Sequence, residues 1–117
     1  MYANYLLVLL PEFKAFELEL DEAMNTNDIR MARRTLVQYS HHAQRAAALL
    51  SNSDDAAERD LATLLRESST TATKVKSRLM TDTSTTVSEA AKPLVEEVSD
   101  VASKANGLVA SYQLKVA

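Results

Sequence analysis

Cysteine and tryptophan are absent from this chain, glycine occurs once and proline twice. Without cysteine, disulfide frameworks, thiolate metal sites and cysteine nucleophiles are all excluded. The tight turns of hairpins and sheets require glycine and proline, so their scarcity argues against an all-β or α/β fold. Aromatic residues make up only 5% of the chain. The apolar content comes mainly from Ala, Leu and Val, and small or unbranched side chains favour helix.

A strong positive charge is also missing, because 16 acidic residues outnumber 13 basic ones and give a net charge of -3. Phosphate neutralisation needs clustered Lys and Arg, so this balance argues against a general nucleic-acid binder. The length of 117 residues is typical of one domain, and a hydrophobic content of 46% suffices for one core. We therefore expect a single helical domain over residues 1–117.

The apolar run near the start of the chain is too short to span a membrane. It extends from Tyr2 to Leu10, about half of the roughly 20 residues that a bilayer requires. No Lys or Arg precedes it, and Pro11 and Glu12 follow it, so it does not resemble a secretory signal. We expect it to begin the first helix. The lack of cysteine is compatible with a cytoplasmic location, which is the location we expect.

Four segments carry apolar residues at spacings that alternate between three and four, which predicts amphipathic helices. The helices are expected at about 2–24, 28–50, 53–80 and 87–114, with a Ser/Thr-rich linker at 81–86. Their apolar stripes must face each other or another chain, and a mean spacing of about 3.5 residues implies coiled-coil-like packing. We predict an all-α fold, either an antiparallel bundle of about four helices or helical hairpins that assemble as a dimer.

Short polar residues mark where the helices begin and end. The run from Asn25 to Asp28 is expected to end the first helix and to cap the second. Ser53, which two acids follow, is expected to cap the third helix. Thr86 with Glu89 fits the capping-box pattern for the fourth.

Two prolines and one polar stretch leave local questions open. Pro11 either starts the main part of the first helix or kinks it, and Pro93 is expected to kink the fourth helix. The segment from Ser68 to Thr73 reads SSTTAT. It is either a polar layer inside the third helix or a break in it.

Charge favours pairing of the first two helices. Residues 11–24 contain five acids and one lysine, whereas residues 29–50 contain four arginines and no acid. We expect ion pairs between these helices to select their orientation more than to stabilise them, because an exposed pair is worth only about 0.2–1 kcal/mol.

No residue pattern indicates catalysis or metal binding. His41 and His42 are the two histidines, and adjacent helical positions point about 100° apart, which is poor geometry for one metal ion. Glu-x-x-His motifs, glycine-rich phosphate loops and nucleophile sets are not visible. The basic residues around Tyr39 lack interleaved aromatic residues, so nucleic acid is not expected as a partner. We therefore expect no enzyme activity, no cofactor and no metal.

Two sets of apolar residues lie beside the main stripes and exceed what a simple bundle needs. One set flanks the first stripe, and the other forms a seven-residue series beside the fourth. They predict either a deeper core or a docking groove or oligomer seam. The candidate partner or oligomer interface consists of Leu6, Leu7, Val8, Leu10, Phe13, Val95, Ala102 and Val109.

Between the first two predicted helices stand Asn27 and Asp28, and near the end of the chain stand Asn106, Gly107, Leu108 and Tyr112. With these residues and this order of amphipathic helices, the chain resembles the small helical export chaperones of flagellar and type III secretion systems. The resemblance extends over most of the chain. It implies a cytoplasmic chaperone that masks the amphipathic end of an exported protein.

Four amphipathic stripes without attached chemistry are typical of a helical protein–protein interaction module. We expect an adaptor, a scaffold subunit or a chaperone-like binder with helical protein partners, and self-association into a homo-oligomer. The alternatives are the export-chaperone function and peripheral attachment to a membrane or lipid surface through an amphipathic helix.

Overall fold

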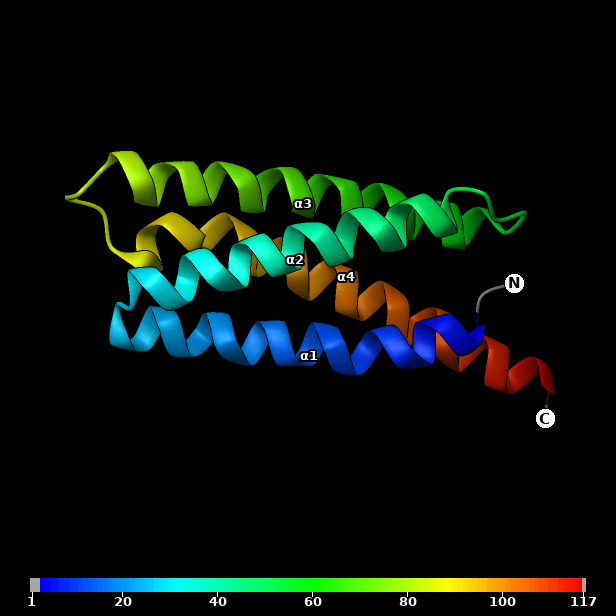
Figure 1. The fold of residues 1–117 in the computed structure, drawn as a ribbon. Helices are drawn as coiled ribbons and strands as arrows, with labels where there is room; N and C mark the ends of the chain where they lie inside the picture. Colours follow the sequence, from blue (N-terminus) through cyan, green and yellow to red (C-terminus); the bar gives the residue numbers. More distant parts are fainter. Residues whose placement is uncertain (1–2, 117) are drawn as a thin grey trace.

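The computed structural model describes the backbone of residues 3–116 and the side chains of residues 5–112, and this part of the chain consists of four helices and short connections. The helices are α1 (Ala3–Thr26), α2 (Ile29–Leu50), α3 (Ala56–Thr81) and α4 (Val87–Val116). Successive helices run antiparallel and lie side by side, and α4 returns to pack against α1 (Figure 1). This closes a four-helix bundle of 51 × 23 × 17 Å. The predicted all-α fold is confirmed, in the form of a bundle within one chain.

The polar run between α1 and α2 caps two helices at once. Asp28 is the N-cap of α2, and its Oδ1 accepts a 3.0 Å hydrogen bond from the N–H of Met31. Asn27 has a φ of 50°, a left-handed conformation that Asn adopts more readily than most residues. Its Oδ1 accepts a 2.9 Å hydrogen bond from the N–H of Val87, so the α1–α2 turn also caps the start of α4.

The start of α3 differs from the prediction. Ser53 was the expected cap, but Asp55 is the N-cap and accepts a 2.8 Å hydrogen bond from the N–H of Ala57. A carboxylate is favoured over a hydroxyl there because the helix N-terminus carries partial positive charge. The Ser53 hydroxyl instead accepts a 3.0 Å hydrogen bond from the N–H of Asp55. At the start of α4 the Thr86 hydroxyl accepts a 3.1 Å bond from the N–H of Glu89, as the capping pattern predicts.

Neither the prolines nor the polar stretch interrupts a helix. Helical structure continues through Pro11 in α1 and through Pro93 in α4, so Pro11 does not start the first helix. The stretch from Ser68 to Thr73 is a polar layer inside α3 and not a break. Its threonine hydroxyls donate to carbonyls four residues earlier, as Thr70 does to the carbonyl of Arg66 at 3.1 Å. These bonds satisfy the hydroxyls within the helix.

The closest packing in the bundle is between α2 and α3. The buried alanines of these two helices include Ala43, Ala46, Ala47, Ala62 and Ala72, and such small side chains let helix backbones approach each other. Hydrogen bonds between hydroxyl groups also join α2 to α3. Tyr39 and Ser68 share a hydrogen bond of 2.7 Å between their hydroxyl oxygens. Burial raises the pKa of Tyr39 to about 12.

Larger side chains fill the space between α1 and α2, whose contact is less extensive. Phe13 and Phe16 lie against Tyr39, with ring centroids 5.8 and 5.6 Å apart. The predicted ion pairs between the arginines of α2 and the acids of α1 are wrong. Within residues 5–112 the close contact between a basic and an acidic side chain of these helices runs from His42 Nδ1 to Glu12 Oε2 at 3.4 Å, and it is an ion pair only with a protonated histidine. The arginines lie on the exposed face of α2, where water solvates them.

The apolar run near the start of the chain forms the first turns of α1. Among its described side chains, Leu6 and Leu9 are buried in the core, whereas Leu7 and Val8 face outward. Over the described residues, no helix provides the length of apolar sequence that a bilayer crossing requires.

Candidate functional site

A groove runs between α1 and α4 on one side of the bundle. Two hollows form it, with volumes of about 310 Å³ and 570 Å³. Lys14, Glu17 and Ser99 border both hollows, so the two adjoin each other, and together they are termed the α1/α4 groove. Its α1 wall extends from Leu7 to Met24, which corresponds to a helical rise of about 26 Å.

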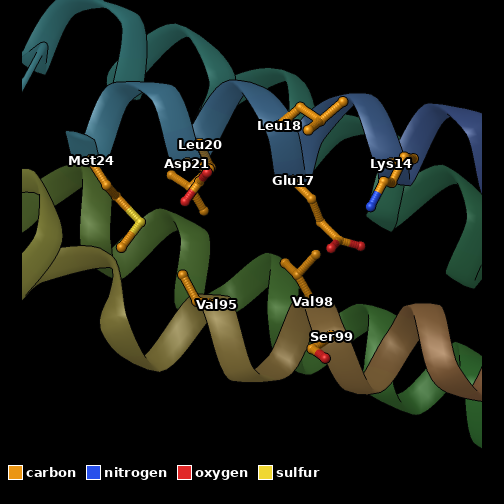
Figure 2. Close-up of a pocket in the computed structure, with 9 residues that line it drawn as sticks. All are labelled: Lys14, Glu17, Leu18, Leu20, Asp21, Met24, Val95, Val98 and Ser99. Carbon is orange, nitrogen blue, oxygen red and sulfur yellow. The ribbon is translucent and has the colours of Figure 1, made fainter. Parts of the chain in front are cut away.

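Apolar side chains make up most of the walls of the α1/α4 groove. They are Leu7, Leu10, Pro11, Leu18, Leu20 and Met24 from α1 and Val95, Val98 and Ala102 from α4. Leu18, Leu7 and Val95 are 60%, 49% and 40% exposed. Figure 2 shows Met24 extending from α1 toward α4, and Val95 and Val98 extending from α4 toward α1. A single exposed apolar side chain is ordinary, but a row of them along a groove is typical of an interaction surface.

Three charged side chains border the groove, and all of them belong to α1. They are Lys14, Glu17 and Asp21, whereas the polar residues of the α4 wall are the uncharged Ser99, Ser103 and Asn106. Among the described side chains, none of these three charges takes part in an ion pair. Lys14 and Asp21 are exposed and lie on one face of α1, about two turns apart. Both charges are therefore accessible to a docked molecule.

The residues predicted to form an interface lie in different surroundings. Leu7, Leu10, Val95 and Ala102 line the α1/α4 groove. Leu6, Phe13 and Val109 are buried in the core of the bundle, so packing within the chain accounts for their apolar character. Val8 is 62% exposed and does not line the groove.

Sequence reasoning missed the middle of the groove, where Lys14, Leu18 and Asp21 lie. Together with Leu7, these residues follow one another at intervals of seven, four and three, which is the spacing of one helix face. Half of the members are charged, so a search for apolar residues alone does not detect the series. A search for exposed heptad positions of any type would have found it.

A buried carboxylate lies at the end of the bundle where α3 starts and α4 ends. Glu58 is fully buried there, and the Tyr112 hydroxyl donates to its Oε2 at 2.6 Å. The Ser53 hydroxyl donates to the other oxygen, Oε1. Burial raises the pKa of Tyr112 well above the usual value of a tyrosine, and the hydrogen bond to Glu58 and the negative charge of Glu58 raise it further. Because hydroxyl donors compensate the burial of the carboxylate, we assign this cluster a structural role.

The two histidines point to different surroundings. His42 packs against Phe16 with ring centroids 5.4 Å apart and faces Glu12, whereas His41 is exposed. Across the described side chains, no group of three or more His, Asp or Glu residues is placed to hold a metal ion.

Comparisons with known proteins assign no family to this chain. No protein-family model matches it, and no curated protein or solved structure matches it either. The resemblance to export chaperones therefore depends on the order of the helices and on the residues Asn27, Asp28, Asn106, Gly107, Leu108 and Tyr112.

Proposed function

We propose that the chain is a non-enzymatic helical interaction module that packs its α1/α4 groove against a helical surface of another protein molecule. The observation that carries the proposal is the row of exposed Leu7, Leu18 and Val95 along a groove whose α4 wall bears no charge. Removing an apolar side chain of this exposure from water is worth on the order of 1 kcal/mol. The row therefore supplies a driving force for association with another apolar surface.

The shape of the groove fits a helical occupant. Its α1 wall of about 26 Å matches a helix of about 17 residues. A docked amphipathic helix presents apolar residues at intervals of three and four. On the α1 wall of the groove, Leu7, Leu10 and Leu18 lie three and eight residues apart, so apolar contacts are available about every one to two turns along its length. An adaptor, a scaffold subunit and a chaperone-like binder would all use the groove in this way. A cytoplasmic location belongs to the same proposal.

Site-specific photo-crosslinking of the full chain in its native cells tests the proposal. A photoreactive amino acid replaces Leu18 or Val95 in the groove, and Thr63, which is exposed on α3, serves as the control position. We expect the two groove positions to give a protein adduct of defined mass and Thr63 to give none. The proposal is refuted if neither groove position forms an adduct with any protein, including a second copy of this chain.

Binding to a lipid surface is a second candidate function, and the exposure of Val8 favours it. Val8 and Leu7 are adjacent, outward-facing residues on the first turns of α1, where two apolar side chains can enter the interfacial region of a bilayer. Co-sedimentation with phosphatidylcholine vesicles, with and without phosphatidylserine, tests this candidate. We expect Val8→Glu to reduce pelleting, and a chain that pellets with neither type of vesicle removes the candidate.

A further inference from the structure

The groove-lining faces of α1 and α4 are each complementary to themselves in the antiparallel direction. We propose that the molecule docked on the α1/α4 groove is a second copy of this chain, related by a two-fold axis that crosses the bundle at the level of Leu18 and Ser99. The inference rests on the function proposed above, because the second copy covers the same groove. In this arrangement α1 lies on α1 of the partner subunit and α4 lies on α4 of the partner subunit, and no single helix lies in the groove.

On α1 the complementarity is one of charge. Lys14 and Asp21 are exposed on the same face, about two turns apart. In an antiparallel pair of identical helices, residues at equal distances on either side of the two-fold axis meet. An axis midway between Lys14 and Asp21 therefore places each lysine opposite Asp21 of the partner subunit. The midpoint lies between Glu17 and Leu18, so the exposed Leu18 lies beside the axis and is covered by Glu17 and Leu18 of the partner subunit.

On α4 the complementarity is one of shape. Val95 and Ala102 line the groove and are also about two turns apart. The midpoint between them lies between Val98 and Ser99. An axis at this midpoint places Val95 against Ala102 of the partner subunit, so that a larger side chain meets a smaller one, as close packing requires. Ser99 beside the axis is small and lets the two α4 helices approach.

The two midpoints lie at the same level of the bundle. The residues on either side of them, Glu17, Leu18, Val98 and Ser99, all line one hollow of the groove, as Figure 2 shows. One axis therefore satisfies the charge pairing on α1 and the packing on α4 together. A partner of unrelated sequence would have to match both patterns separately, and for this reason the observations favour a second copy.

The size of the face predicts a reversible dimer. A face about 26 Å long and two helices, or about 20 Å, wide would bury on the order of 1,000 Å² over both copies, which is the lower limit for a specific interface. The exposed Lys–Asp pairs set the register more than the affinity. We therefore expect a dimer with a dissociation constant on the order of micromolar.

Exchange of the charges at Lys14 and Asp21 tests the arrangement. Sedimentation velocity of the full chain over a concentration series gives the dimer dissociation constant of each variant. We expect Lys14→Asp and Asp21→Lys, each alone, to raise this constant about tenfold or more, because like charges then face each other across the axis. The double variant restores opposite charges and returns the constant to within about threefold of its original value.

Lys74→Asp is the matched control, because Lys74 is exposed on α3 and the substitution changes the net charge by the same amount as Lys14→Asp. We expect it to leave the dissociation constant unchanged. Far-UV circular dichroism of every variant shows whether the fold is retained. A double variant that folds but does not recover dimerisation overturns the proposed axis.

Failure of this inference is distinguishable from failure of the proposed function. A chain that is monomeric at all concentrations, while Leu18 and Val95 crosslink to a different protein, overturns the second copy and retains the groove as a docking site. A dimer that responds to neither Lys14→Asp nor Asp21→Lys uses another face and also overturns the inference. A chain that shows neither a dimer nor crosslinks at the groove overturns the proposed function itself.

Discussion

Replacement of Tyr112 by Phe removes one hydroxyl from the buried end of the bundle and little else. The Tyr112 ring is 5% exposed, and Phe fills the same space without creating a cavity. The interactions that are lost are the 2.6 Å hydrogen bond to Oε2 of Glu58, a carboxylate that is fully buried, and a longer hydrogen bond of 3.4 Å to Oδ2 of Asp55. The variant therefore measures mainly the contribution of the shorter hydrogen bond, which the buried carboxylate of Glu58 accepts.

The expected magnitude follows from the charge of the acceptor. Hydrogen bonds to charged groups contribute about 1.5–3 kcal/mol, and an acceptor that loses a donor in the interior keeps its desolvation cost. We expect Tyr112→Phe to lower the free energy of unfolding by about 2 kcal/mol. For a domain of this size that corresponds to a fall in Tm of roughly 8 °C. Urea and thermal unfolding followed by far-UV circular dichroism measure both quantities.

Tyr39→Phe is the matched control, because Tyr39 is also buried but has a neutral partner. That partner, Ser68, retains its own 2.9 Å hydrogen bond to the carbonyl of Leu65. A neutral pair contributes about 0.5–1.5 kcal/mol, so the control should be about half as destabilising. The reasoning about Glu58 is refuted if Tyr112→Phe proves no more destabilising than Tyr39→Phe.

Three further predictions concern titration, the α1–α2 turn and core packing. The pKa of Tyr39 is raised from 10.0 to about 12, so between these pH values the folded state retains a proton that the unfolded state releases. The stability that Tyr39 contributes should therefore be fully present below about pH 10 and be lost as the pH rises toward 12. Urea unfolding at a series of pH values across this range measures the loss. Asn27→Ala and Asn27→Gly both lose the hydrogen bond to Val87, but only Ala is strained at a φ of 50°. Thermal unfolding should therefore show that the Ala variant is less stable than the Gly variant by about 1 kcal/mol. Ala47→Leu overpacks a buried position and should cost about 1–3 kcal/mol, whereas Ala48→Leu at the exposed neighbour should be nearly neutral in calorimetry.

Much of the fold follows from local pattern, because one face of each helix turns toward the axis of the bundle. The alternating spacing therefore predicted most of the buried residues of α2 and α4. In α3 the pattern was less informative. The alternating spacing from Ala57 through Leu61 leads to Leu64, which is partly buried, whereas Leu65 is fully buried. α3 takes part in the two most extensive helix contacts of the bundle, with α2 and with α4, and consequently buries a wider face than one stripe.

Burial of Glu58 could not be predicted from its neighbours in sequence. An acid in the first turn of a helix is favoured by the helix dipole even when it is exposed, so Glu58 has an ordinary explanation at the surface. Its burial depends on Tyr112, which is 54 residues away. A contact of this separation is specified by the packing of α4 on α3 and not by any local pattern.

The candidate groove was predictable in part. Val95 and Ala102 formed a second series beside the main stripe, which indicated an additional apolar face on the last helix. The sequence pattern does not specify which helix that face meets. In the structure this face of α4 meets α1, because the bundle closes between α1 and α4. Only with that neighbour known do Lys14 and Asp21 become part of the same surface.

The position of the groove follows from where small side chains face each other. Between α2 and α3 both helices contribute alanines, so the backbones approach in the core. The hollow beside this seam, of about 510 Å³, is lined mainly by polar residues such as Gln44, Arg66 and Thr70 and offers no row of apolar side chains. Between α1 and α4 the small residues Ser99, Ala102 and Ser103 lie on one side, and Lys14 and Glu17 lie opposite. Charged side chains turn toward water and do not fill the space left by small neighbours. The bundle therefore leaves Leu18 and Val95 uncovered at this seam, and a second helical surface can complete their burial without unfolding any part of the chain.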